Sequence, residues 1–203
     1  MRESGILMHI TSLPAPYGIG TMGKDAYAFV DFLVRAGQRY WQILPLTPTG
    51  YGDSPYQSLG ACAGNHYLID LDRLADEGLL KKEEIQNISW GSNPARVDFG
   101  AMYAHRMNVL RLAFQRFAPD EAYETFVEQN RSWLEDYALF TALKDTLGGK
   151  PWLDWPEALR LRKADALAEK RRELSDEIRL QYFVQYEFDR QWKALRSYAN
   201  AKG

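Results

Sequence analysis

A short polar stretch near residue 50 combines flat aromatic rings with side chains that bind hydroxyl groups. It reads GYGDSPYQS, Gly50 to Ser58, and an asparagine follows at Asn65. A pyranose ring presents C–H patches that stack on aromatic faces, and hydroxyls that need paired donors and acceptors. The combination favours a sugar-binding loop, and a rigid turn whose tyrosines only pack is the alternative. The candidate residues are Tyr51, Asp53, Ser54, Tyr56, Gln57 and Asn65.

A second motif, GIGTMG from Gly18 to Gly23, fits the G-x-G-x-x-G pattern of dinucleotide-binding folds. Two features argue against that interpretation. The residues TSLPAPY separate the motif from the preceding strand, and Tyr40 to Gly50 contains no Asp or Glu to bind a ribose. We interpret the glycines as turn and helix-entry residues, and a dinucleotide-binding oxidoreductase stays open as a minor alternative.

These motifs lie on a predicted strand, helix, strand unit. Ile6 to Ile10 and Tyr40 to Leu46 are apolar runs that are too short for typical helices and rich in strand formers, which predicts buried strands. A helix that stops at Gly37 is expected between them, with an apolar stripe at Ala26, Phe29, Val30 and Leu33. Such a unit implies parallel strands in a sheet that is covered on both faces or closed into a barrel.

The second half of the chain is predicted to be helical. HYLIDLDRLADEGLL, from His66, indicates a short strand or extended piece that runs into a small helix, and residues 101 to 202 carry almost no strand signal. The stretch LGGKPWLDWP breaks the helices. Two parallel strands alone leave open edges and little face to bury, so more sheet must come from elsewhere.

The composition of the chain limits the kinds of partner and the cellular compartment that we expect. A net charge of -2 gives no overall field to attract nucleic acid or acidic membranes, and the 46% hydrophobic fraction supports a packed core. The first apolar run, about six residues, is too short for a signal or a membrane span. The single cysteine, Cys62, fits a reducing compartment, and the three histidines have no metal-like spacing. We expect a cytoplasmic protein without a metal, cofactor, nucleic-acid or membrane partner, and its oligomeric state stays open.

Three stretches, in this order and spacing, resemble the start of 4-alpha-glucanotransferases of the amylomaltase type, glycoside hydrolase family 77. They are SLPAPYGIGTMG, AGQRYWQILPLTPTGYGDSPYQS and AGNHYLIDLDRLADEGLL. The helical QYFVQYEFDRQWKALRSYANAKG also resembles the family's helix that leads into the third barrel strand. The resemblance covers essentially all 203 residues, and GDSPYQS is its most discriminating part.

The resemblance implies an α/β fold, the N-terminal part of a (β/α)8 TIM barrel. This part holds the first two parallel strands and their crossover helix, with a large helical insertion after strand two. The expected segments are 1–72 for the start of the barrel, 73–175 for the insertion, and 176–203 for the helix that returns before strand three. A barrel needs about 250 residues, which is more than this chain has. By the resemblance, the sequence is expected to stop where strand three should begin.

The family's reaction is retaining transfer between α-1,4-glucans. A carboxylate attacks the anomeric carbon, a second carboxyl group protonates the leaving sugar, and the 4-hydroxyl of another glucan or glucose displaces the enzyme. The two carboxyl groups must lie about 5 to 5.5 Å apart, whereas Asp53 is the only acid near the predicted strand ends. The resemblance places the catalytic carboxylates after later strands. We therefore expect no catalytic residue here and no activity from the chain alone, with a non-catalytic glucan-binding module as the alternative.

The resemblance carries residue roles onto the loop. Tyr56 corresponds to the tyrosine that stacks on the sugar where the bond is cleaved, and Ser54 to a neighbouring acceptor-side contact. Asp53, Gln57 and Asn65 are expected to shape the loop or bind hydroxyls.

A secondary glucan site away from the catalytic cleft is also implied. Tyr51 resembles the family's tyrosine in that site, and its partner aromatic is expected at Phe99 or Tyr103. The expected partners are α-1,4-glucans, namely maltooligosaccharides and amylose.

Overall fold

The computed structural model describes residues 2–93 and 95–203, and the chain divides into two compact units. The first unit holds the residues up to Ala118 together with 187–203, and the second holds 119–186. These units reflect packing and do not test the expected division into barrel and insertion, which stays a prediction.

The first unit contains both strands and most of the short helices. Its elements in chain order are β1 (Gly5–Leu7), α1 (Lys24–Arg35), β2 (Tyr40–Gln42), α2 (Leu71–Asp76), α3 (Lys82–Gln86) and α4 (Phe99–Arg116), with 3-10 turns at Ile10–Ser12, Tyr51–Asp53 and His66–Leu68. The residues of α8 (Ser175–Asn200) from 187 onward also belong to it.

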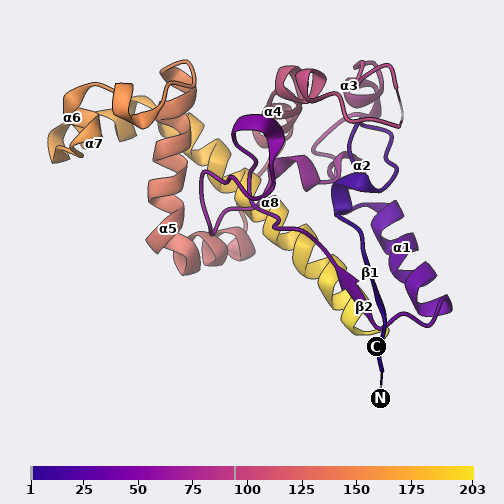
Figure 1. Cartoon of the computed structure of the whole chain (residues 1–203). Coiled ribbons are helices and arrows are strands. Elements are labelled where there is room, and N and C mark those ends of the chain that lie inside the picture. The colour runs from indigo at the N-terminus through magenta and orange to yellow at the C-terminus, as the bar shows by residue number, and fades with distance from the viewer. Residues whose placement is uncertain (1, 94) are drawn as a thin grey trace. The chain divides into compact units, whose positions relative to one another are not determined.

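The strand pair confirms the predicted crossover. β1 and β2 are parallel in the register Gly5↔Tyr40, Ile6↔Trp41 and Leu7↔Gln42, and α1 connects them (Figure 1). The ring of Phe29 on α1 meets Trp41 edge-on at 5.0 Å. The Trp41 indole N–H donates to the carbonyl of Met8 at 2.7 Å, so the helix and the strands form one packed layer pair.

The strands differ from the prediction in length and burial. Each has three residues, and the runs expected to continue to Ile10 and Leu46 leave the ladder, Ile10 in a 3-10 turn. Leu7 is 58% exposed and Tyr40 59% exposed, so the expectation of strands buried on both faces is wrong for this chain. The physical reason is that each strand has a single hydrogen-bonded neighbour among the described residues. A lone pair has too little sheet to cover both faces.

The crossover helix follows its predicted pattern. Ala26, Val30 and Leu33 are buried. Gly37 adopts a φ of +67°, which suits a residue without a Cβ, and the Gln38 N–H donates to the Leu33 carbonyl at 2.9 Å. The stop predicted at Gly37 is confirmed.

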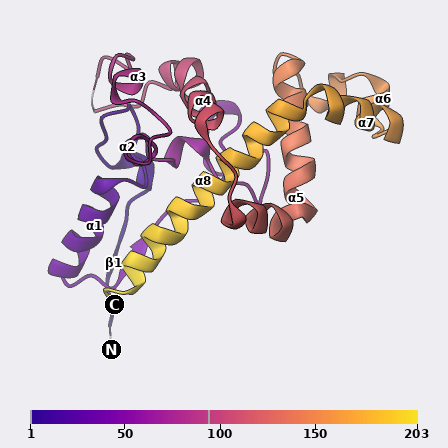
Figure 2. The ribbon, with the colours of Figure 1, turned by 180° about the vertical axis from the view of Figure 1, so that it is seen from behind.

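The C-terminal half of α8 lies beside β1, β2 and α1 in both views (Figures 1 and 2). The Tyr198 hydroxyl donates to the carboxylate of Asp31 on α1 at 2.8 Å, and Lys202 binds the same carboxylate at 2.6 Å. Residues from opposite ends of the chain therefore build one core in this unit.

The described residues of the second unit form helices joined by turns, without a strand, as the sequence predicts for this region. It contains α5 (Glu121–Thr146), a 3-10 turn at Trp152–Asp154, α6 (Glu157–Arg160), α7 (Ala164–Glu173) and the first turns of α8. Gly148 and Gly149, both at positive φ, end α5 where the breaker was predicted. The buried core of this unit comprises Ala138, Leu139, Ala142, Leu143, Trp155, Leu159, Leu167 and Ile178. Within residues 2–93 and 95–203, no helix is long and apolar enough to cross a membrane.

Candidate functional site

The loop after β2 is closed by its own backbone. Thr49 and Ser58 form an isolated antiparallel bridge, and the Gly50 N–H donates to the Gln57 carbonyl at 2.8 Å. Gly52 and Asp53 both adopt positive φ, 73° and 56°, so the chain turns sharply between them. An aspartate tolerates this left-handed conformation better than most residues. Backbone hydrogen bonds therefore hold this loop in one turn conformation.

The tip of the loop presents Tyr56 to solvent. Its side chain is 72% exposed, the highest value among the exposed large apolar residues of the described chain. The Ser54 side-chain oxygen accepts from the Tyr56 N–H at 3.3 Å, which fixes the approach to the ring. Gln57 is exposed beside it, and Ser54 is half-buried. The side chain of Tyr51 lies outside the described part of the structure.

The loop is tied to α4 by one side-chain hydrogen bond. The Tyr103 hydroxyl donates to the carboxylate of Asp53, fifty residues away in the sequence. Burial, then this hydrogen bond and the charge of Asp53, raise the pKa of Tyr103 to about 12, so the phenol keeps its proton. The predicted loop residue Asp53 and the predicted insertion residue Tyr103 therefore meet.

Three aromatic rings gather next to this hydrogen bond. Phe99 and Tyr103 of α4 lie 6.5 Å apart between ring centroids, and Tyr67 lies 6.4 Å from Phe99 and 6.3 Å from Tyr103. Tyr103 remains 59% exposed, whereas Tyr67 is buried. Phe99 and Tyr103 thus form one aromatic surface beside the loop.

Asn65 has a different environment from the rest of the predicted site. It is 4% exposed, and its amide oxygen accepts from the Tyr67 N–H at 2.9 Å as the N-cap of the following 3-10 turn. Its own N–H donates to the Leu46 carbonyl at 2.7 Å. Asn65 thus joins the loop after β2 to the next 3-10 turn, and a direct sugar contact by this residue stays a prediction.

A buried arginine that the sequence analysis missed holds the segment next to the loop. Arg106 on α4 is fully buried, and its guanidinium donates to the carbonyl of Tyr67 at 2.8 Å and to the carbonyl of Ile69. Burial lowers the pKa of Arg106 to about 10, and the charge of Asp70 opposes this effect. The sequence signal was present, because Arg106 falls on the buried stripe of α4 with Met102, Val109, Leu110 and Ala113.

Asp70 is the second missed residue of this segment. Its carboxylate accepts from the Thr21 hydroxyl at 2.5 Å and from the Arg73 N–H at 3.0 Å, where it caps α2. Its N–H donates to the Gln191 side chain of α8 at 2.7 Å. The segment expected to be a short strand or extended piece before α2 therefore begins as a 3-10 turn at His66–Leu68, and residues from several remote segments hold it.

The neighbouring His66 carries no charge at physiological pH. Burial, and then the charge of Arg106, lower the pKa of His66 to about 3. Its ring lies 4.2 Å from that of Tyr67, as an aromatic packing partner.

The G-x-G-x-x-G motif serves packing. Gly18 adopts a φ of +79°, and a Cβ there would lie 2.6 Å from the Trp90 carbonyl. A Cβ on Gly23 would lie 2.0 Å from the Asp70 carboxylate, at the start of α1. A negative charge therefore already lies where a dinucleotide phosphate would need the helix N-terminus, which argues against the oxidoreductase alternative.

The first unit also contains a hollow of about 730 Å³ between the loop after β1 and the segment before α4. Its walls include Thr11, Ser12, Trp90, Asn93, Arg96 and Phe99. Sequence analysis did not predict this feature, because its walls come from loops about eighty residues apart.

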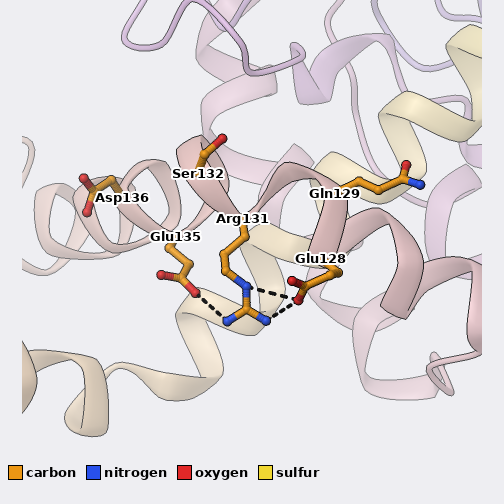
Figure 3. Close-up of a pocket in the computed structure, with 6 residues that line it drawn as sticks. All are labelled: Glu128, Gln129, Arg131, Ser132, Glu135 and Asp136. Atoms are coloured by element: carbon orange, nitrogen blue, oxygen red, sulfur yellow. Dashed lines mark hydrogen bonds and ion pairs between the residues drawn. The ribbon is translucent and has the colours of Figure 1, made fainter.

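The second unit has a hollow of about 490 Å³ on α5. Figure 3 shows Arg131 between Glu128 and Glu135, with its guanidinium ion-paired to both. Exposed pairs of this kind on one helix face are solvated and contribute little, so we assign no chemistry to this hollow. In the described ranges, no group of three or more His, Cys, Asp or Glu side chains is placed to hold a metal ion.

Comparison with known proteins settles the family. The family model described as 4-alpha-glucanotransferase, glycoside hydrolase family 77, matches residues 8–203. The chain belongs to this family. The 4-alpha-glucanotransferase of Thermus thermophilus is 49% identical over all of this chain, and that of Clostridium butyricum 47% identical over 96% of it. This glycoside hydrolase family 77 chain spans 41% and 40% of those two proteins.

Solved structures agree with this assignment. An amylomaltase from Streptococcus agalactiae, solved in complex with acarbose, matches the whole chain with a TM-score of 0.96 and 47% identity. The chain covers 42% of that structure. An amylomaltase from Corynebacterium glutamicum at 18% identity, with a TM-score of 0.71, shares the fold.

Proposed function

We propose that this chain forms the glucan-binding N-terminal part of a 4-alpha-glucanotransferase. The reaction is transfer of an α-1,4-glucan segment to the 4-hydroxyl of another glucan or glucose, by retaining double displacement. In this proposal residues 1–72 begin a (β/α)8 barrel, 73–175 form a helical insertion, and 176–203 return to the barrel. The acarbose bound by the Streptococcus agalactiae relative supports a glucan-like ligand.

The observation that carries the proposal is the exposed ring of Tyr56 on a closed turn in the segment that follows the parallel strand β2. Active sites of barrels lie at the carboxyl ends of their strands, where this loop begins. Tyr56 supplies a flat apolar face, and Ser54 and Gln57 supply hydroxyl and amide groups beside it. The aromatic surface of Phe99 and Tyr103 is the proposed secondary glucan site together with Tyr51.

The acids of this region already have structural partners. Asp53 accepts from Tyr103, Asp70 from Thr21, and Asp72 from Tyr17 at 2.6 Å. None is a free carboxylate beside Tyr56, so the proposal places the catalytic pair outside residues 1–203.

A transfer assay tests this placement. Incubated with maltotriose, the chain should release no glucose and form no longer glucans, because it supplies binding groups without a carboxylate pair. The matched control is the Thermus thermophilus relative under the same conditions. Glucose and maltopentaose produced by this chain would show that the carboxylates were misplaced.

The second candidate function, a glucan-binding module without chemistry, is favoured by the same three engaged acids. This function also predicts that the chain releases no glucose and forms no longer glucans from maltotriose. The two separate when the chain is mixed with the remaining part of a relative, since only a portion of an enzyme should restore transfer.

Substitution of Tyr56 tests the binding site itself. Tyr56→Ala should weaken maltooligosaccharide binding about 2- to 12-fold, because one aromatic stacking contact contributes about 0.5 to 1.5 kcal/mol beyond area burial. Isothermal titration of maltoheptaose into both proteins measures the change. Tyr56→Phe keeps the ring face and should bind nearly as well as the unmodified chain. Equal affinity of the alanine variant would remove Tyr56 from the site.

A further inference from the structure

The hollow between the loop after β1 and the segment before α4 has the size of a small-ligand site. Its volume, about 730 Å³, lies within the roughly 300 to 1,000 Å³ typical of such sites. Hydroxyl, amide and guanidinium groups line it together with the aromatic residues Trp90 and Phe99. The hollow is distinct from the Tyr56 loop, whose residues do not line it.

Two polar groups in its walls are available to a ligand. Ser12 and Arg96 are exposed, and within residues 2–93 and 95–203 their side chains have no hydrogen-bond or ion-pair partner. A guanidinium offers five N–H donors and a hydroxyl both donates and accepts, as neighbouring sugar hydroxyls require. The other polar side chains that line the hollow, Thr11 and Asn93, are neutral groups that both donate and accept, as the hydroxyls of a polyhydroxylated ligand require.

One wall of the hollow is rigid before any ligand arrives. Gly18 packs so closely on Trp90 that no Cβ would fit, and the Trp90 indole N–H donates to the Ile85 carbonyl at 2.9 Å. Tyr17 also meets Trp90 edge-on at 6.1 Å. A preformed wall lowers the ordering cost of binding.

The position of the hollow connects it to the proposed glucan sites. The loop from Thr11 to Gly20 follows β1, and the Tyr56 loop follows the parallel β2, so both leave the same edge of the strand pair (Figure 1). Phe99 lines the hollow and also belongs to the aromatic surface with Tyr103. A glucan that passes Tyr103 can therefore extend towards the hollow.

We propose that this hollow binds a further stretch of α-1,4-glucan, separate from the contact at Tyr56. This inference rests on the proposed function and adds to it a third binding surface, formed by Ser12, Trp90, Arg96 and Phe99.

The test follows backbone amide signals of the ¹⁵N-labelled chain by NMR during titration with maltoheptaose. Signals from residues 11–20 and from 51–58 report on the two regions separately. In the double variant Ser12→Ala/Arg96→Ala, we expect the apparent Kd read from residues 11–20 to rise about fivefold or more, because two hydrogen-bonding groups are lost. The Kd read from 51–58 should change less than about twofold.

A matched control uses the same two substitutions elsewhere in the same unit. Arg196→Ala/Ser197→Ala also removes an exposed arginine and an exposed serine, and it should leave both Kd values unchanged. Spectra without sugar verify that each variant is folded.

The outcomes separate this inference from the proposed function. Saturable shifts confined to 51–58 would overturn the glucan site in the hollow and leave the proposed function standing. Equal effects of the double variant and its control would overturn it as well. Absence of shifts in both regions would remove the proposed function and this inference together.

Discussion

Asp70→Ala should lower the free energy of unfolding by about 3 to 5 kcal/mol. The substitution removes the N-cap of α2 and the acceptor of the buried Thr21 hydroxyl. It also removes an opposite charge that acts on the fully buried Arg106, and an uncompensated buried charge is costly. Urea denaturation followed by circular dichroism measures the loss.

Two further variants separate the causes of this loss. Asp70→Asn keeps one oxygen to cap α2, but it removes the charge and replaces the oxygen that accepts from Thr21, so the difference between the two variants measures the contribution of the cap. Asp76→Ala removes an acid from the same helix whose ion pair with Lys82 is exposed at 3.9 Å, and it should cost less than about 1 kcal/mol. If Asp70→Ala cost no more than Asp76→Ala, Asp70 would not organise this segment.

Gly20→Ala should destabilise the chain by about 2 to 3 kcal/mol. A Cβ at this buried position would lie 1.9 Å from the Ile10 carbonyl oxygen and 2.8 Å from that of Leu13. Both contacts are to backbone, which cannot turn away as a flexible side chain can. The backbone between β1 and α1 must shift to relieve the overlap, and thermal or urea unfolding reports the cost.

The control for this prediction is Gly100→Ala in the first turn of α4. That glycine is exposed, and the nearest atom to an added Cβ is a carboxylate oxygen of Asp98 at 3.2 Å. Alanine is a better helix former than glycine by about 0.5 to 1 kcal/mol, so this variant should be neutral or slightly more stable. Similar losses at both positions would show that Gly20 is not sterically required.

Local sequence patterns predicted the elements better than their extents. The stripe from Ala26 to Leu33 and the stop at Gly37 follow from side-chain periodicity and one backbone conformation, which are properties of neighbouring residues. The strands from Ile6 and Tyr40 were predicted too long, because an apolar run does not reveal how many hydrogen-bonded neighbours its residues will have. Strand length depends on the sheet, and only one pairing is described here.

In the candidate site too, the residue types could be predicted from the sequence, whereas the contacts between distant residues could not. The loop around Tyr56 could be predicted from its residue types and its place after a strand. The hydrogen bond between Tyr103 and Asp53 could not, because periodicity assigns residues to faces and leaves their distant partners open. Arg106 could have been found as a charge on the apolar stripe of α4, whereas its two carbonyl partners depend on the fold.

The hydrogen bond between the Asp70 N–H and Gln191 has a consequence for synthesis of the chain. It joins residues 121 positions apart, so the first unit cannot complete its core until α8 has left the ribosome. At about 5 to 20 residues per second, roughly 6 to 24 seconds separate the emergence of the two partners. Residues 119–186 are contiguous and are synthesised before Gln191. We therefore expect the second unit to fold first, while the core of the first unit is still incomplete and accessible to chaperones and proteases.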